Sequence, residues 1–270
     1  MIWNAKNGRV SLDGTDMDFV SFGRGKRALI LLPGLSDGLT TVRGKALLLA
    51  RPYRLFFGDR AVYMFSRRNA LAEGTTIREM AADQARVLQA LGIGRAAVVG
   101  VSEGGMIAQY LAMDHPELVE KLVLAVTAPR CTPLARACLE RWIGFAERGD
   151  HRGLMTDTAE RSYSEARLRR LRPAYPLLGR VGRPKSYDRF LVNARAILGF
   201  DARAELERIA CPTLILGGER DQIVGPEASR ELHAGIAGSR IHMYEGLGHA
   251  AYEEAGDFYP RIQAFLQEQT

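Results

Sequence analysis

The chain has 270 residues, of which 47% are hydrophobic and 25% are charged, as in a globular protein built as one large domain or as one domain with an insertion. This composition excludes disordered, collagenous and repeat-built chains. The net charge of +6 is unevenly placed, because residues 130–200 alone carry 15 basic and 7 acidic side chains.

Three features of the sequence indicate the cellular compartment of the protein. The longest apolar runs have about six residues, whereas a membrane-spanning helix needs about twenty, and the first residues show no signal-peptide pattern. The three cysteines are too few and too scattered for a disulfide framework or a zinc site: Cys131, Cys138 and Cys211. We therefore expect a cytoplasmic protein with no membrane span.

The predicted strands form a mostly parallel sheet. Residues 9–12 and 16–22 flank the turn signal Asp13-Gly14 and predict an antiparallel hairpin. Later apolar runs do not alternate between apolar and polar residues, as a strand with one solvent-exposed face does. The absence of alternation is typical of strands buried on both faces of a parallel sheet. These runs, with two weaker ones, predict strands at residues 28–32, 61–65, 96–101, 122–126, 213–216 and 240–244.

Helical patterns lie between these strands. One begins at Thr76 and ends at Gly92, a second covers residues 103–113, and the last covers residues 251–269. Alternating strands and helices predict an α/β fold with a mostly parallel central sheet flanked by helices. Residues 130–205 interrupt this alternation of strands and helices, because they hold amphipathic helical patterns but no predicted strand. We interpret them as a helical insertion.

The sequence Gly100-Val-Ser-Glu-Gly104 follows a predicted buried strand and opens a predicted helix. In this context G-x-S-x-G is typical of a nucleophile elbow, in which a strained turn exposes the hydroxyl of Ser102 and the flanking glycines leave room for it. The backbone N–H of Glu103 at the start of the helix would then face a developing oxyanion. The alternative is a glycine-rich turn that only ends the strand.

Two later loops supply the partners that a serine nucleophile needs. Asp221 follows the predicted strand 213–216, and His249 follows the strand 240–244 in a glycine-flanked loop. Both positions lie beyond the carboxyl ends of parallel strands, where ligands bind in open α/β sheets. The order Ser102, Asp221, His249 is also the order associated with the G-x-S-x-G elbow. The backbone N–H of Leu35, after the turn at Pro33-Gly34, is the second predicted oxyanion donor.

The chain resembles the serine hydrolases of the α/β-hydrolase fold over nearly its whole length. The likeness rests on P-G-L-S at 33–36, G-V-S-E-G-G at 100–105, P-E-L-V-E-K-L-V-L at 116–124, C-P-T-L-I-L-G-G-E-R-D at 211–221 and G-L-G-H at 246–249. The resemblance implies an α/β-hydrolase core of residues 1–129 and 206–270, a helical cap or lid at 130–205, and hydrolysis through an acyl-enzyme with no metal and no organic cofactor.

The sequence departs from that family at two positions. Pro33-Gly34 stands where many members have His-Gly, and Glu103 stands where Gln, Met or Leu is more frequent. A carboxylate at the start of a helix is favoured by the helix dipole, so we interpret Glu103 as a helix-start residue, with a role in specificity as the alternative.

A serine at position 102 favours attack on an acyl carbon and excludes the aspartate-nucleophile branches of the family. We expect carboxylester cleavage, with thioesterase, lactonase or C–C bond hydrolase activity, or non-catalytic binding of a small molecule, as alternatives. Three aromatic residues of the insertion are candidates for the substrate pocket: Trp142, Tyr163 and Phe190. The basic clusters at 167–172 and 180–185 leave an anionic substrate open, although a solvated helix face explains them more simply. We expect a monomer or homodimer with no nucleic-acid partner.

Overall fold

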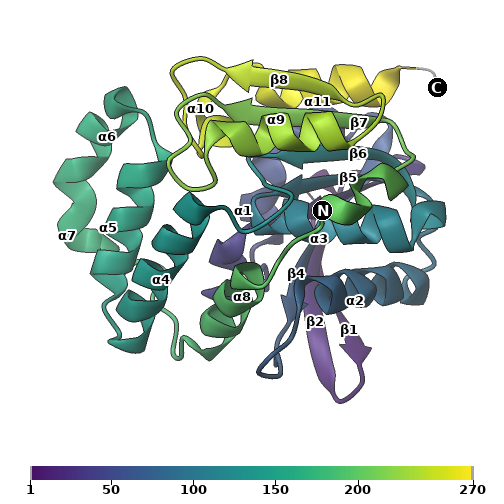
Figure 1. Ribbon diagram of the computed structural model, residues 1–270. Helices are drawn as coiled ribbons and strands as arrows, with labels where there is room; N and C mark the ends of the chain where they lie inside the picture. Colours follow the sequence, from purple (N-terminus) through teal and green to yellow (C-terminus); the bar gives the residue numbers. More distant parts are fainter. Residues whose placement is uncertain (1, 269–270) are drawn as a thin grey trace.

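One eight-stranded sheet forms the centre of the computed structural model, which describes residues 2–268 (Figure 1). Its strand order is β1-β2-β4-β3-β5-β6-β7-β8, with β1 and β2 antiparallel to their neighbours and all other pairs parallel. The strands are β1 Lys6–Leu12, β2 Thr15–Phe22, β3 Arg27–Leu32, β4 Arg60–Arg68, β5 Ala96–Val101, β6 Val119–Ala125, β7 Thr213–Gly218 and β8 Arg240–Tyr244. The predicted α/β fold with a mostly parallel sheet is confirmed.

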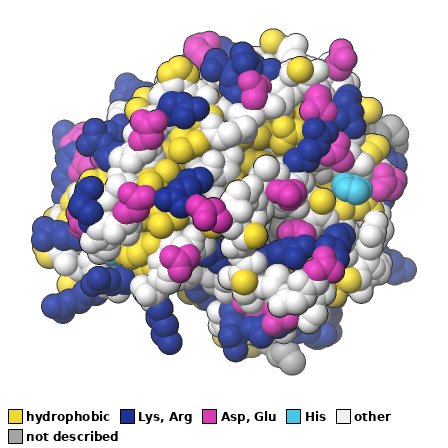
Figure 2. Space-filling model, turned by 60° about the horizontal axis from the view of Figure 1, so that its bottom comes forward, with side chains coloured by type: hydrophobic (Ala, Val, Ile, Leu, Met, Phe, Trp, Pro, Cys, Tyr) yellow, Lys and Arg dark blue, Asp and Glu magenta, His cyan; other side chains and the backbone are white. Residues whose placement is uncertain are grey.

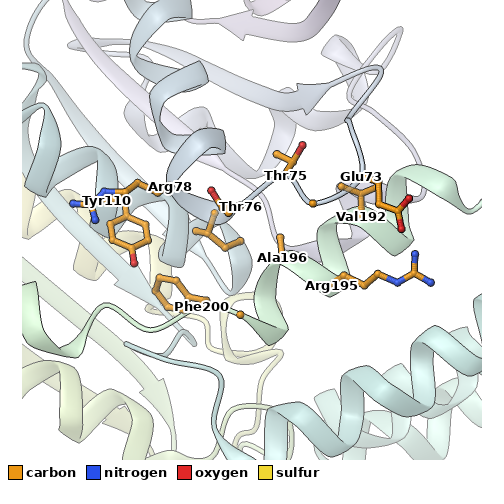
Figure 3. A pocket seen from close by; sticks show the side chains of 12 residues that line it. Glu73, Thr75, Thr76, Arg78, Tyr110, Val192, Arg195, Ala196 and Phe200 are labelled. Atoms are coloured by element: carbon orange, nitrogen blue, oxygen red, sulfur yellow. The ribbon is translucent and has the colours of Figure 1, made fainter.

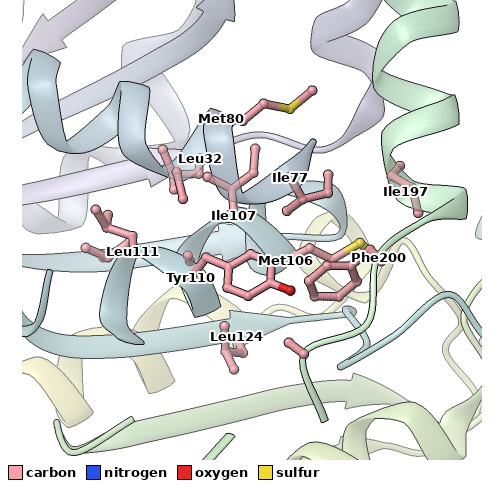
Figure 4. Close-up of a cluster of buried hydrophobic side chains, with 14 of the residues drawn as sticks. Leu32, Ile77, Met80, Met106, Ile107, Tyr110, Leu111, Leu124, Ile197 and Phe200 are labelled. Atoms are coloured by element: carbon pink, nitrogen blue, oxygen red, sulfur yellow. The ribbon is translucent and has the colours of Figure 1, made fainter. Parts of the chain in front are cut away.

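Helices cover both faces of the sheet. On one face pack α2 Ile77–Ala90, α3 Glu103–Asp114 and α9 Pro226–Gly235, and on the other pack α1 Ala46–Ala50, α10 Ala251–Glu254 and α11 Phe258–Gln267. Alternate residues of each central strand belong to the two cores; in β3, for example, Ile30 and Leu32 face one core and Leu29 and Leu31 face the other. Figure 4 shows part of the first core, between the sheet, α2 and α3.

The start of α2 follows its sequence signal closely. The side chain of Thr76 accepts a hydrogen bond from the backbone N–H of Glu79, and the Glu79 carboxylate accepts one from the backbone N–H of Thr76. This reciprocal capping box satisfies N–H groups that have no acceptor inside the helix.

The prediction of a single final helix was wrong. The chain is extended at Ala255 and passes Gly256 before α11 begins, so α10 and α11 are separate helices. The break re-aims the chain so that Phe258, Ile262 and Phe265 are buried against the sheet. The end of the predicted helix, at residue 269, lies outside the described residues.

Residues between β6 and β7 form the helical insertion. Its helices are α4 Pro133–Glu147, α5 His151–Ser162, α6 Glu165–Leu171, α7 Tyr175–Leu178 and α8 Asp188–Leu198. Its two ends are hydrogen-bonded to each other, from Cys131 N–H to the Phe200 carbonyl at 2.9 Å and from Ala202 N–H to the Pro129 carbonyl at 2.8 Å. The domain boundaries at 129/130 and 205/206 stay a prediction. Over residues 2–268 no helix is both long enough and apolar enough to cross a membrane.

Candidate active site

Ser102 occupies a sharp turn between β5 and α3. Its backbone angles are φ 54° and ψ −121°, a region that non-glycine residues adopt at a cost of about 1–3 kcal/mol. The turn depends on two glycines, because a Cβ on Gly100 would lie 2.4 Å from the Gly104 carbonyl oxygen and a Cβ on Gly104 would lie 2.0 Å from the Leu32 carbonyl oxygen. The local geometry is that of the predicted elbow.

Hydrogen bonds hold the strained backbone of Ser102 in place. Its N–H donates to the Ala125 carbonyl of β6 at 2.9 Å, and its carbonyl accepts from Gly105 N–H at 2.8 Å and from the Thr127 hydroxyl at 2.7 Å. Sequence reasoning missed Thr127, whose only signal is its place two residues after the end of β6.

The side chains of Ser102, His249 and Asp221 form one hydrogen-bonded row. Nε2 of His249 lies 3.0 Å from Oγ of Ser102, and Nδ1 lies 2.8 Å from Oδ2 of Asp221. An ionised carboxylate only accepts hydrogen bonds, so Nδ1–H donates to Asp221 and Nε2 is left to accept the serine proton. The structure therefore brings together the three residues that the sequence placed in three separate loops.

The carboxylate of Asp221 is buried, 4% exposed, and fully engaged. Its Oδ1 accepts from the backbone N–H groups of Ile223 at 2.8 Å and Val224 at 3.0 Å. Burial raises the pKa of Asp221, but the attraction and hydrogen bond of His249 and these two N–H donors outweigh it, so the pKa lies below its ordinary value. Asp221 is thus an anion that fixes the orientation of the imidazole.

The residues that carry the two predicted oxyanion donors each begin a helical segment near Ser102. Leu35 starts the 3₁₀ helix η2, Leu35–Gly38, and Glu103 starts α3. N–H groups in a first helical turn have no acceptor within their own helix. The loop passes close to the serine, since a Cβ on Gly34 would lie 3.2 Å from the Cβ of Ser102. Leu35 and Glu103 are thus the first residues of two helical segments that begin near Ser102.

The side chain of Glu103 is buried in the protein interior. It is 0% exposed, and its Oε2 accepts a hydrogen bond from Nη2 of Arg67 at 2.7 Å. Burial raises the pKa of Glu103, and the positive charge of Arg67 opposes that rise. Glu103 is therefore more than a solvated helix-start residue, because its carboxylate is one half of a buried ion pair.

Arg67 belongs to a larger buried group of charges that sequence reasoning missed. Asp37, in η2, accepts from the Ser66 hydroxyl at 2.6 Å and from the backbone N–H of Arg67 at 3.0 Å, and it also accepts from the guanidinium of Arg189 in α8. Burial raises the pKa of Asp37, but Arg189 and Arg67 outweigh it and hold the pKa below its ordinary value. The only sequence signal was a charged residue at the end of an apolar strand.

The three aromatic candidates for the substrate pocket lie in different surroundings. Trp142 is 5% exposed inside the insertion, where its Nε1–H donates to Asp157 at 2.8 Å. Tyr163 lines a cavity of ≈ 410 Å³ beside the loop of His249. Phe190 packs on η2, since a Cβ on Gly38 would lie 2.8 Å from its Cα. Their role in substrate binding stays a prediction.

A further cavity, of ≈ 420 Å³, opens between the start of α2 and helix α8 (Figure 3). Its wall includes Tyr110 and Phe200, and Arg78, whose guanidinium lies 4.6 Å from the centre of the Tyr110 ring. Ser102 and its two partners do not line this cavity. The two arginines that line it are already paired within the chain, Arg78 with Asp114 and Glu205, and Arg195 with Glu147.

Many basic side chains of the insertion are paired with acidic ones. Arg172 binds Glu160 at 2.9 Å and Glu165 at 2.7 Å, and Arg161 binds Asp157 at 2.8 Å. On the face shown in Figure 2, basic and acidic side chains are interspersed over much of the surface. These pairs favour the interpretation of a solvated helix face.

Comparisons with known proteins identify the family of the chain. The family model for the alpha/beta hydrolase fold matches residues 27–256, so the chain belongs to the α/β-hydrolase fold family. The 2-hydroxymuconate semialdehyde hydrolase of Pseudomonas sp. (strain CF600) is 30% identical over 89% of this chain and 87% of its own length. The polyketide synthase ThaQ of Burkholderia thailandensis is 30% identical over 94% of this chain, which spans only 12% of ThaQ.

A solved structure shows the same fold. The enol-lactonase from Burkholderia xenovorans LB400 superimposes with a TM-score of 0.81 over 97% of this chain and 100% of the lactonase, at 22% sequence identity. At that identity the likeness establishes the fold alone. Together with the family match, it confirms the resemblance inferred from the sequence motifs, and the protein is a hydrolase of this family.

Proposed function

We propose that the protein is a serine hydrolase that cleaves carboxylester bonds through a covalent acyl-enzyme. The observation that carries the proposal is the hydrogen-bonded row from Ser102 Oγ through His249 to Asp221, at 3.0 Å and 2.8 Å. These distances suit proton transfer from the hydroxyl to the imidazole as the serine attacks a carbonyl carbon.

The reaction proceeds in two half-cycles. Ser102 Oγ attacks the ester carbonyl while Nε2 of His249 takes its proton, and the resulting imidazolium is stabilised by Asp221. The imidazolium then gives the proton to the leaving alcohol, which leaves the acyl group on Ser102. In the second half-cycle His249 takes a proton from water, and the hydroxide formed attacks the acyl carbon. The imidazolium then returns the proton to Oγ of Ser102 as the C–O bond to the serine breaks and the acid is released.

The negative charge on the carbonyl oxygen is stabilised by backbone donors. The N–H groups of Leu35 and Glu103 begin helices that meet beside Ser102, where the positive ends of the peptide dipoles add to the hydrogen bonds. The insertion serves as a cap over this site, a role supported by the packing of Phe190 in α8 against Gly38 in η2.

Cleavage of an activated C–C bond is the second candidate. It is favoured by the 30% identity to 2-hydroxymuconate semialdehyde hydrolase over most of both chains. Turnover of p-nitrophenyl esters of increasing chain length, measured beside a lactone, a thioester and a vinylogous diketone, separates these reaction classes. The highest kcat/KM on the diketone would replace the ester proposal by the second candidate.

The serine mechanism is tested by Ser102→Ala. We expect this variant to lose labelling by a fluorophosphonate probe and at least about 10⁴-fold in turnover of p-nitrophenyl acetate, because no other group supplies the nucleophile. Ser239→Ala is the matched control, since that hydroxyl lies 2.9 Å from the His233 ring rather than in the row of Ser102. Retained turnover in Ser102→Ala would refute the mechanism.

A further inference from the structure

The two proposed oxyanion donors are joined by one buried arginine. Nη2 of Arg67, at the end of β4, donates to the Pro33 carbonyl at 2.6 Å and to Oε2 of Glu103 at 2.7 Å. Pro33 directly precedes the turn that carries Leu35, and Glu103 carries the second N–H. A single guanidinium nitrogen therefore connects the two backbone segments whose spacing defines the oxyanion hole.

The other end of the same loop is held by the same strand. Asp37 binds the Ser66 hydroxyl and the Arg67 backbone N–H, and Nη1 of Arg67 lies 3.7 Å from Oδ2 of Asp37. Asp37 is 3% exposed, Arg67 2% and Glu103 0%. Charge-assisted hydrogen bonds are stronger and more directional away from water, so this burial favours one fixed arrangement of the loop.

Helix α8 of the insertion completes the group. Nε of Arg189 donates to the Arg68 carbonyl at 2.8 Å and Nη2 to the Arg67 carbonyl at 3.1 Å, and the guanidinium also binds the carboxylate and the carbonyl of Asp37. Two carboxyl groups thus face two guanidinium groups in one cluster. Arg189 places the insertion directly on the loop that carries Leu35.

We propose that Arg67 is a positioning residue for the oxyanion hole, and that the row Glu103–Arg67–Asp37–Arg189 sets the spacing of the two N–H donors and fixes α8 against them. The proposal rests on the proposed function, which gives those N–H groups their role. Apolar residues of similar volume often stabilise an interior as well as a buried ion pair does, so stability alone does not require these charges. Apolar residues could not bind the Pro33 carbonyl.

The test separates kcat from KM in Arg67→Met, with a p-nitrophenyl ester as substrate. We expect kcat to fall about 10- to 100-fold with KM within about threefold of the wild-type value, because an error of about 1 Å in a catalytic group costs about 10² in rate. The inhibition constant of phenylboronic acid, whose tetrahedral serine adduct places an oxygen in the hole, should rise in parallel. Arg67→Lys should recover part of kcat, since an ammonium group can donate to both oxygens.

Two further variants distinguish positioning from folding. Arg67→Met combined with Glu103→Met leaves no unpaired carboxylate at position 103, and we expect the same loss of kcat with a smaller loss of Tm. Arg60→Met is the matched control, because Arg60 is 1% exposed at the opposite end of β4 and binds the Leu266 carbonyl at 3.2 Å. It should lower Tm and leave kcat unchanged.

The outcomes are distinguishable from failure of the proposed function. Labelling of Ser102 by the fluorophosphonate probe, with kcat within about twofold of wild type in the Arg67→Met variants, overturns this inference alone. An equal loss of kcat in Arg60→Met also overturns it, because the effect would then be general. A wild-type protein that is not labelled at Ser102 overturns the proposed function and this inference together.

Discussion

A single methyl group added at Gly104 should disturb the candidate site more than most larger changes elsewhere. In Gly104→Ala the new Cβ would lie 2.0 Å from the Leu32 carbonyl oxygen, 2.5 Å from its carbon and 2.7 Å from the Pro33 carbonyl oxygen. All three atoms belong to the backbone, so no side chain can rotate away. Ordinary contact begins at 3.4 Å, and α3 and the end of β3 must therefore separate by about 1.4 Å, the difference between 3.4 and 2.0 Å.

That separation has two consequences of known size. Overpacking in an interior costs about 1–3 kcal/mol, and about 1 kcal/mol lowers the Tm of a domain of this size by about 2–4 °C. The same movement carries the loop of Leu35 away from Ser102, and a shift of about 1 Å in a catalytic group costs about 10² in rate. Gly104→Ala should thus lower Tm by several degrees and kcat on p-nitrophenyl acetate by about 100-fold.

The control is Gly94→Ala, just before β5, where no heavy atom lies within 4 Å of the added Cβ. Its stability should change by no more than about 0.5 kcal/mol, and its kcat should not change. Thermal unfolding and steady-state kinetics of both variants provide the measurement. A Gly104→Ala protein that matches the wild type in Tm and kcat would refute the argument from close approach of the backbones.

Two other predictions concern buried carboxylates. Asp221→Asn keeps the shape of the side chain but presents an N–H group to Nδ1 of His249, which stabilises the wrong tautomer of the imidazole. We therefore expect kcat to fall by about 10⁴ with little change in Tm. A loss of kcat below about tenfold would contradict the role assigned to Asp221. Asp37→Asn should destabilise the protein by about 1–3 kcal/mol in urea unfolding at about pH 7. Because the folded-state pKa of Asp37 lies below its ordinary value of 3.8, the stabilisation by the carboxylate is complete well above pH 3.8 and is lost as the pH falls through the folded-state value. The difference in stability from wild type should therefore shrink at about pH 3, and a difference that grows with acid would contradict the assigned charge state.

The sheet and the row of Ser102 could be predicted because their signals are local. Strand 96–101 begins and ends where the apolar pattern predicted, since a strand buried on both faces needs apolar residues throughout. The elbow depends on glycines within two residues of Ser102, and the partners of Ser102 follow strands whose ends lie on one edge of the sheet. The break between α10 and α11 was missed because a lone Gly256 is compatible with a continuous helix.

The buried charges behind the site could not be predicted, because their contacts join residues far apart in the sequence. Arg189 is one of 15 basic residues in 130–200, and the sequence does not distinguish it from solvent-exposed arginines such as Arg172. Only the fold shows that Arg189 meets Asp37, 152 residues earlier. The substrate pocket has the same difficulty, since the sequence marks Trp142 and Tyr163 only as aromatic residues of the insertion, whereas the structure places them in different parts of it.

The paired ends of the insertion have an evolutionary consequence. Since the chain leaves the sheet near Pro129 and returns at Ala202 through neighbouring, mutually hydrogen-bonded segments, everything between them can lengthen, shorten or be transplanted as a module without moving β6 or β7. Under the proposed role of the insertion as a cap, selectivity can then diversify while the residues that carry the chemistry stay unchanged. One condition limits such exchange, because Asp37 is paired with Arg189 of the insertion. An insertion without a cation at that position would leave Asp37 with Arg67 as its only guanidinium partner within residues 2–268, so the core that receives it would need a compensating change.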